Sequence, residues 1–137
     1  MIVKNDGGQA ALPTVLLIGS VITEIAIAGA LIAFVLSNAG LNERLSAQAL
    51  VAAQSGVEDA IAKIAVNEDF SSSGYSFLVD NRQANVTIEK DPLGYPLGTD
   101  RIISSGIALN HQRTLEAIVI VDRTTGKVDL QSTVETQ

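Results

Sequence analysis

The side chains that could do chemistry in this chain are few and scattered. His111 is the only histidine, and the 137 residues include no cysteine. Disulfides and thiolate zinc sites are therefore excluded. Nucleophilic catalysis needs a serine or cysteine beside a base that a third group orients, and no such pattern surrounds His111. We interpret this histidine as part of a hairpin loop, Asn110-His111-Gln112, between two strand-like runs.

The acidic residues do not form a metal-binding pattern either. A calcium loop needs several oxygen ligands within about a dozen residues, and the stretch DPLGYPLGTD offers two carboxylates. No glycine run has the spacing of a phosphate-binding loop. We therefore expect no catalytic residues, no cofactor and no metal, and predict that the chain is not an enzyme. The aspartates that flank predicted loops are Asp91, Asp100, Asp122 and Asp129.

The charge pattern also argues against nucleic acid as a partner. The net charge is −6, and the nine lysines and arginines are spread among acids along the chain. Phosphate binding needs clustered bases, and base stacking needs more aromatic side chains than three Phe and two Tyr. We expect no binding to DNA or RNA.

One charge does stand in an unusual place. Ala10 to Leu36 form an almost unbroken apolar run of about 27 residues, longer than the roughly 20 needed to cross a bilayer as a helix. Glu24 is the only charged residue in that run. A charge at mid-membrane costs about 2.5–3.5 kcal/mol on insertion scales, so Glu24 is expected to need a partner.

The first secondary-structure element that the sequence predicts is a long helix. The helical pattern continues beyond the apolar run to about Asn67, with an amphipathic stripe that includes Leu41, Leu45, Ala49, Ala52, Gly56 and Ala60. Small residues in the apolar half allow close contact between helices. Asn38-Ala39-Gly40 is a candidate kink or break. A secretory signal peptide is a poor alternative, because its apolar stretch has 7–15 residues.

The rest of the chain predicts a small antiparallel sheet. A loop is expected over 70–74, strands over 75–80 and 84–90, and a turn-rich excursion over 91–100. The segment RIISSGIALNHQRTLEAIVIVD is the clearest β signal, and a turn over 124–127 precedes a last strand over 128–134. The predicted fold class is α+β: a long N-terminal helix, hydrophobic and then amphipathic, packed on a small antiparallel β-sheet.

Two stretches resemble type IV pilin-like proteins, of the minor-pilin (PilX-like) or pseudopilin kind. The first is a short leader that ends in Gly8 and is followed at once by Gln9, Ala10 and the apolar helix. The second is IISSGIALNHQRTLEAIVIV, which is similar to an Ile-x-Ser-x-Gly, short loop, Arg-Thr hairpin of such subunits. Together they cover about half of the chain.

The resemblance implies both an organisation and a function. A class III-type leader over 1–8 would be cut between Gly8 and Gln9 by a prepilin peptidase, with methylation as part of the processing. A transmembrane and filament-core helix over 9–40, an amphipathic helix over 41–69 and an antiparallel β domain over 70–137 would follow. The implied function is a structural subunit of an extracellular pilus-like filament.

The implied partners follow from that function. They are like subunits in a helical homo-oligomer or other pilins, the prepilin peptidase, an inner-membrane assembly platform, and membrane lipid before assembly. The chain would sit in the cytoplasmic membrane as a single-pass protein and later in an extracellular filament. Two alternatives remain open: a membrane-anchored monomeric binding or sensory module, and a pseudopilin of a secretion system.

The chain departs from the family pattern at the start of its mature part. Many pilins carry an aromatic residue after the cleavage glycine and a glutamate at the fifth mature position, where this sequence has Gln9 and Pro13. We therefore expect Glu24 to make the polar contact in a filament core, with an amino terminus or a polar group of another subunit. The alternative is that Glu24 is protonated or faces a local water defect.

Overall fold

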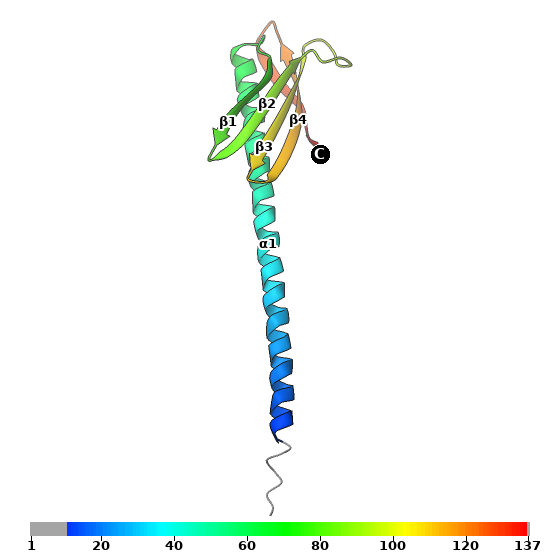
Figure 1. Ribbon diagram of the computed structural model, residues 1–137. Helices are drawn as coiled ribbons and strands as arrows, with labels where there is room; N and C mark the ends of the chain where they lie inside the picture. Colours follow the sequence, from blue (N-terminus) through cyan, green and yellow to red (C-terminus); the bar gives the residue numbers. More distant parts are fainter. Residues whose placement is uncertain (1–10, 137) are drawn as a thin grey trace, which may run out of the picture. The chain divides into compact units, whose positions relative to one another are not determined.

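The computed structural model describes residues 11–136, which form one long helix followed by a five-stranded sheet. This arrangement confirms the predicted α+β class (Figure 1). The chain divides into two units, with the boundary between Leu41 and Asn42. The elements are α1 (Ala11–Val66), β1 (Ser72–Val79), β2 (Arg82–Lys90), β3 (Thr99–Ala108), β4 (His111–Asp122) and β5 (Lys127–Thr136).

α1 is continuous over 56 residues, so the helix does not break at the candidate position 38–40. Asparagine and glycine lower helix propensity by about 1 kcal/mol or less, whereas an interior proline costs about 3 kcal/mol. Pro13 lies in the first turn, where its missing amide hydrogen removes no helical bond. The last turn closes with the Asn67 amide donating to the Lys63 carbonyl at 3.0 Å, and α1 ends at Val66.

The sheet is an antiparallel meander in the order β1-β2-β3-β4-β5. The excursion between β2 and β3 runs from Asp91 to Gly98, because Thr99 already pairs with Ile120. β1 begins at Ser72, so the predicted loop over 70–74 was too long. An irregular register between Ser72 and Tyr75 places Gly74 in the strand at φ +152°.

The hairpin between β3 and β4 is tighter than the predicted loop Asn110-His111-Gln112. Ala108 pairs with His111, which leaves Leu109 and Asn110 as the turn. Leu109 adopts φ +54°, a left-handed conformation that a branched apolar side chain rarely takes. The composition of the turn gives no signal for this geometry, and His111 therefore belongs to β4.

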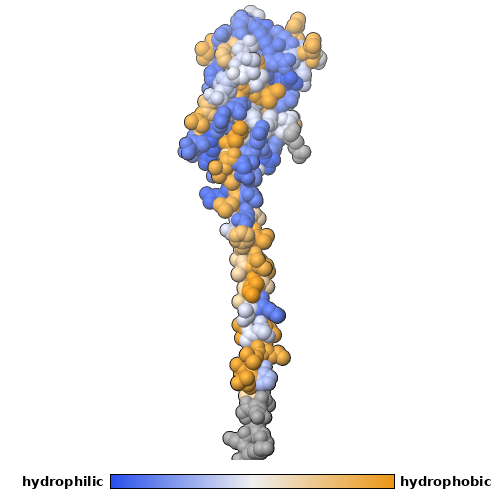
Figure 2. Space-filling model, in the orientation of Figure 1, coloured by the Kyte–Doolittle hydropathy of each residue, from blue (hydrophilic) through white to orange (hydrophobic). Residues whose placement is uncertain are grey.

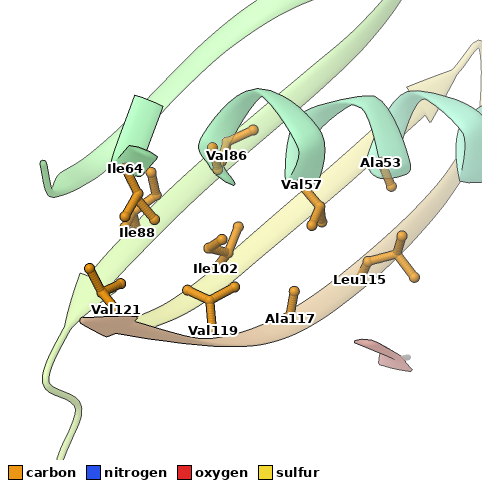
Figure 3. Close-up of a cluster of buried hydrophobic side chains, with 11 residues drawn as sticks. Ala53, Val57, Ile64, Val86, Ile88, Ile102, Leu115, Ala117, Val119 and Val121 are labelled. Atoms are coloured by element: carbon orange, nitrogen blue, oxygen red, sulfur yellow. The ribbon is translucent and has the colours of Figure 1, made fainter. Parts of the chain in front are cut away.

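The core lies between the second half of α1 and one face of the sheet. Figure 3 shows side chains of α1 pointing toward those of β2, β3 and β4. The buried helical stripe begins at Ala49, whereas Leu41 is 52% exposed, so the inward face starts later than the predicted stripe. The core cluster consists of Ala53, Val57, Ala60, Ile64, Val86, Ile88, Ile102, Leu115, Ala117, Val119 and Val121.

Two glycines bring helix and sheet into close contact. A Cβ at Gly106 of β3 would overlap the Ala49 carbonyl oxygen and the Ala53 amide nitrogen of α1. A Cβ at Gly56 of α1 would overlap the Ser104 hydroxyl and stand 2.9 Å from Val86 Cγ2. At Gly106 the backbone of the sheet therefore lies against the backbone of the helix, and at Gly56 the backbone of the helix lies against side chains of the sheet.

Candidate functional site

The largest feature that the fold leaves unexplained is the first half of α1. None of residues 11–41 is buried, and large apolar side chains such as Leu12, Phe34 and Leu36 are about two-thirds exposed. Figure 2 shows hydrophobic colour over most of this half of the helix. Soluble domains rarely expose so large an apolar surface. By length and composition this helix can cross a membrane.

Two hydroxyl side chains of this half form hydrogen bonds within their own helix. Ser20 Oγ donates to the Leu17 carbonyl and Thr23 Oγ1 to the Gly19 carbonyl, both at 2.8 Å. Such bonds satisfy a hydroxyl within its own helix. Glu24 has no hydrogen-bond or ion-pair partner among residues 11–136. The polar contact expected for Glu24 is therefore not made by the described residues.

Small residues follow one side of the same half. Seven of them recur at spacings that alternate between four and three residues, which is the spacing of a helix–helix seam. A Cβ at Gly19 or Gly40 would meet nothing within 4 Å, so neither glycine has a packing role inside this chain. The sequence carries this signal, although composition alone does not reveal it. The series is Gly19, Thr23, Ala26, Ala30, Ala33, Ser37 and Gly40.

Two of the loop-flanking aspartates, Asp91 and Asp122, accept hydrogen bonds that hold the turns beside them. Asp91 Oδ1 accepts a hydrogen bond from the Gly98 amide at 2.6 Å, and Oδ2 accepts one from Arg123 Nη2 at 2.9 Å. The Gly98 amide and Arg123 lower the pKa of Asp91. Asp122 accepts from Thr124 and Thr125, which lowers its pKa as well. No group of three or more His, Asp or Glu side chains that could hold a metal occurs in residues 11–136.

Asp100 differs from these because its side chain is fully buried. Neither carboxyl oxygen has a hydrogen-bond partner, and the nearest cationic atom is Arg123 Nη2 at 3.7 Å from Oδ1. Burial raises the pKa of Asp100 above its ordinary value, against the opposing effect of Arg123.

His111 lies beside a hollow of about 450 Å³ that is also lined by Ser46, Arg113 and Glu135. Arg113 Nε donates to Ser46 Oγ at 2.7 Å, and Arg113 forms an ion pair with Glu135. The Ser46 hydroxyl faces a cation instead of a base. This arrangement ties α1 to β4 and β5 and offers no activated nucleophile among the lining residues.

The predicted leader and its cleavage point, Gly8 and Gln9, lie outside the described residues. Glu24 is described, and it lies on the exposed apolar half of α1. Comparison with protein-family models, with curated proteins and with solved structures finds no match. The case for a function therefore rests on the architecture, a long apolar N-terminal helix whose second half packs on an antiparallel sheet.

Proposed function

We propose that this chain is a structural subunit of a type IV pilus-like filament. The observation that carries the proposal is the first half of α1, in which residues 11–41 are mostly apolar and none is buried against the rest of residues 11–136. The same helix continues into a second half that forms the core of a folded domain. One element thus joins an assembly surface to a domain that has its own core.

The mechanism would be physical. After removal of the leader at Gly8, the apolar helices would leave the lipid and pack against one another in the filament core. Lipid tails are as apolar as leucine, so transfer of these side chains gives no hydrophobic gain, and close packing must supply the stabilisation. The seam from Gly19 to Gly40 allows backbones to approach closely, which supports bundling over a solitary anchor.

Glu24 would supply the polar contact in that bundle. An isolated carboxylate in the core of a membrane or bundle is unfavourable, and an amino terminus or hydroxyl of a neighbouring subunit would offset that cost. Because the contact exists only between copies, it would favour a defined register over random association of helices. The lack of a partner within the described chain supports this role.

The first test is the state of the amino terminus. The full chain would be produced in cells that contain a prepilin peptidase and an assembly platform, and its intact mass measured. A mature chain that begins at Gln9, together with filaments seen by electron microscopy, supports the proposal. An intact Met1 and a monomer in the membrane would contradict it and favour an anchored monomeric module.

The second test is Glu24→Gln. We expect this variant to insert in the membrane but to form few or no filaments, since the amide cannot form an ion pair. Glu43→Gln is the matched control, because Glu43 is an exposed acid outside the apolar run. Assembly of Glu24→Gln at the wild-type level would refute the pairing.

A further inference from the structure

The loop between β2 and β3 contains a tandem repeat that forms two successive turns. In PLGYPLGT, the Tyr95 amide donates to the Pro92 carbonyl and the Thr99 amide to the Pro96 carbonyl, each at 3.2 Å. The third residue of each turn is a glycine, with φ +95° at Gly94 and +87° at Gly98. These are features of type II turns, which place the second residue at the tip.

Each turn presents a leucine at that tip. Leu93 is fully exposed and Leu97 is 92% exposed. Figure 1 shows this loop, in yellow-green, projecting from the end of the sheet. Full burial of one leucine is worth about 1.5–3 kcal/mol, so two exposed leucines forgo a substantial stabilisation within the chain.

The loop is held firmly at its base. Asp91 bonds the Gly98 amide and Arg123, the Asp91 amide donates to the Thr99 carbonyl at 2.9 Å, and the Val121 amide donates to the Gly98 carbonyl at 2.7 Å. These hydrogen bonds fix the backbone at both ends of the loop that carries the two leucines. Little conformational entropy would be lost if they were covered.

The opposite end of the sheet also exposes leucines. In an antiparallel meander, the β1–β2 and β3–β4 turns lie at the end away from the β2–β3 loop (Figure 1). Leu78, next to the first of these turns, is 71% exposed, and Leu109, in the second, is 84% exposed. The two ends of one sheet therefore carry separate apolar tips.

Charge favours contact between these two ends. The tip 92–97 and the turn Leu109–Asn110 contain no charged residue, although the whole chain carries −6. Two acidic copies can therefore meet at these tips without placing like charges together. The area of a few leucine side chains is well below the roughly 1,200–2,000 Å² of a stable interface, so the contact would form only where another interface holds the copies side by side.

We propose that the tandem-turn loop of one copy, through Leu93 and Leu97, contacts the β3–β4 turn of a neighbouring copy, at Leu109, with Leu78 at its margin. The inference rests on the proposed filament, in which bundled α1 helices hold the copies together. Because the contacting surfaces differ, the contact is heterologous and extends from copy to copy instead of closing a dimer.

Cysteine cross-linking tests the contact directly, because the chain contains no cysteine of its own. Full-length Leu97→Cys/Leu109→Cys would be assembled in cells, and the filaments treated with a short bismaleimide and separated under denaturing conditions. We expect a ladder of covalent multimers. Leu97→Cys alone, and Leu97→Cys paired with Gln131→Cys on an exposed part of β5, should remain mostly monomeric.

The other outcomes separate this inference from the proposed function. Filaments without the ladder would refute the contact and leave the filament intact as a proposal. Dimers from Leu97→Cys alone would show an isologous contact, and cross-links to a different protein would show another partner; both overturn the inference. A chain that stays monomeric in the membrane would overturn the proposed function and the contact with it.

A second variant covers the case in which the cysteines themselves disturb assembly. Leu93→Ser/Leu97→Ser changes two exposed side chains, so the domain should fold as the wild type does by circular dichroism. We expect the yield of filaments to fall severalfold at an unchanged subunit level. An unchanged yield, with filaments equally resistant to shear, would refute a role for the loop in subunit contact.

Discussion

At the scale of single residues, Asp100 stands out because a carboxyl group is fully buried without a hydrogen-bond partner. Desolvation favours its neutral form and raises its pKa. The neighbouring cations are Arg123, which already pairs with Asp91, and Lys90, which pairs with Asp69. The Asp91 carboxylate is a third neighbouring charge and raises the pKa of Asp100. These cations compensate Asp100 only in part.

We predict that Asp100→Asn removes a pH-dependent loss of stability. Because the folded-state pKa of Asp100 is raised, its contribution to stability is present below the unfolded-state pKa and is lost as the pH rises through the folded-state pKa. At pH 7 the variant should be at least as stable as the wild type. At pH 3 it should have no stability advantage over the wild type. Thermal unfolding of both chains from pH 3 to 8 checks this.

Asp129→Asn is the control, because it makes the same substitution at an exposed position. If Asp100→Asn were less stable than the wild type at pH 7, the Arg123 attraction would outweigh the cost of burying the charge.

The sequence predicts the structural role of some single residues and not of others. The sequence shows Asp100 as an acid near a loop, but its burial follows from its place on β3, on the same face as the buried Ile102 and Ser104. The seam from Gly19 to Gly40 is present in the sequence as a regular spacing. The sequence singles out Glu24 as a candidate site residue, because a charged side chain within a membrane-spanning segment is costly and usually has a function. The sequence does not predict the left-handed backbone of Leu109, because that conformation results from the register of β3 and β4.

At the scale of elements, the packing of α1 on the sheet depends on a glycine in β3. Gly106 leaves room for the backbone of α1 at Ala49 and Ala53, and a methyl group there would force the helix outward. The contact lies at the start of the buried helical stripe, so a shift there would disturb every helical side chain that follows it in the core.

We predict that Gly106→Ala destabilises the folded domain by at least about 1–3 kcal/mol, the range for overpacking a close contact. Gly40→Ala is the matched control. It lies in a helix with open space around its Cβ position and should be neutral or stabilising by up to about 1 kcal/mol. Chemical denaturation of the full chain in detergent, followed by circular dichroism, measures both. Equal stability of the two variants would show that helix and sheet separate easily.

The periodicity of apolar residues predicts which segments are helix and which are strand. It does not predict the residues at which these elements begin and end. Alternation of apolar residues in β4 predicted the strand because one face packs on α1. The start of β1 lies in a serine-rich segment that reads as a loop, and pairing of Ser72 with Ile88 overrides that composition. Asn38 and Gly40 each lower helix stability only slightly, so a long cooperative helix continues through both residues.

At the scale of the whole molecule, assembly with other copies is our proposal, and the sequence does not define the contacts that such an assembly would use. The apolar half of α1 was evident from composition. The leucine tips were not, because their exposure depends on two turns and on which end of the sheet each leucine occupies. Contacts between copies also depend on total charge, which is −6 at pH 7.

We predict that salt favours assembly. Copies that each carry −6 repel one another, and the Debye length falls from about 30 Å at 0.01 M to about 8 Å at 0.15 M ionic strength. The proposed helix bundle and the proposed leucine contact are formed by apolar side chains, so screening should weaken the repulsion far more than the attraction. The fraction of chain that sediments as filaments should therefore rise with salt over this range.

Asp129→Lys provides the matched variant, because it raises the net charge by two at an exposed position. It should assemble at lower salt than the wild type and show a weaker dependence on salt. Filaments that dissolve as salt rises would contradict the prediction, because ion pairs between copies would then be the main attraction, and the apolar half of α1 would not be the principal contact.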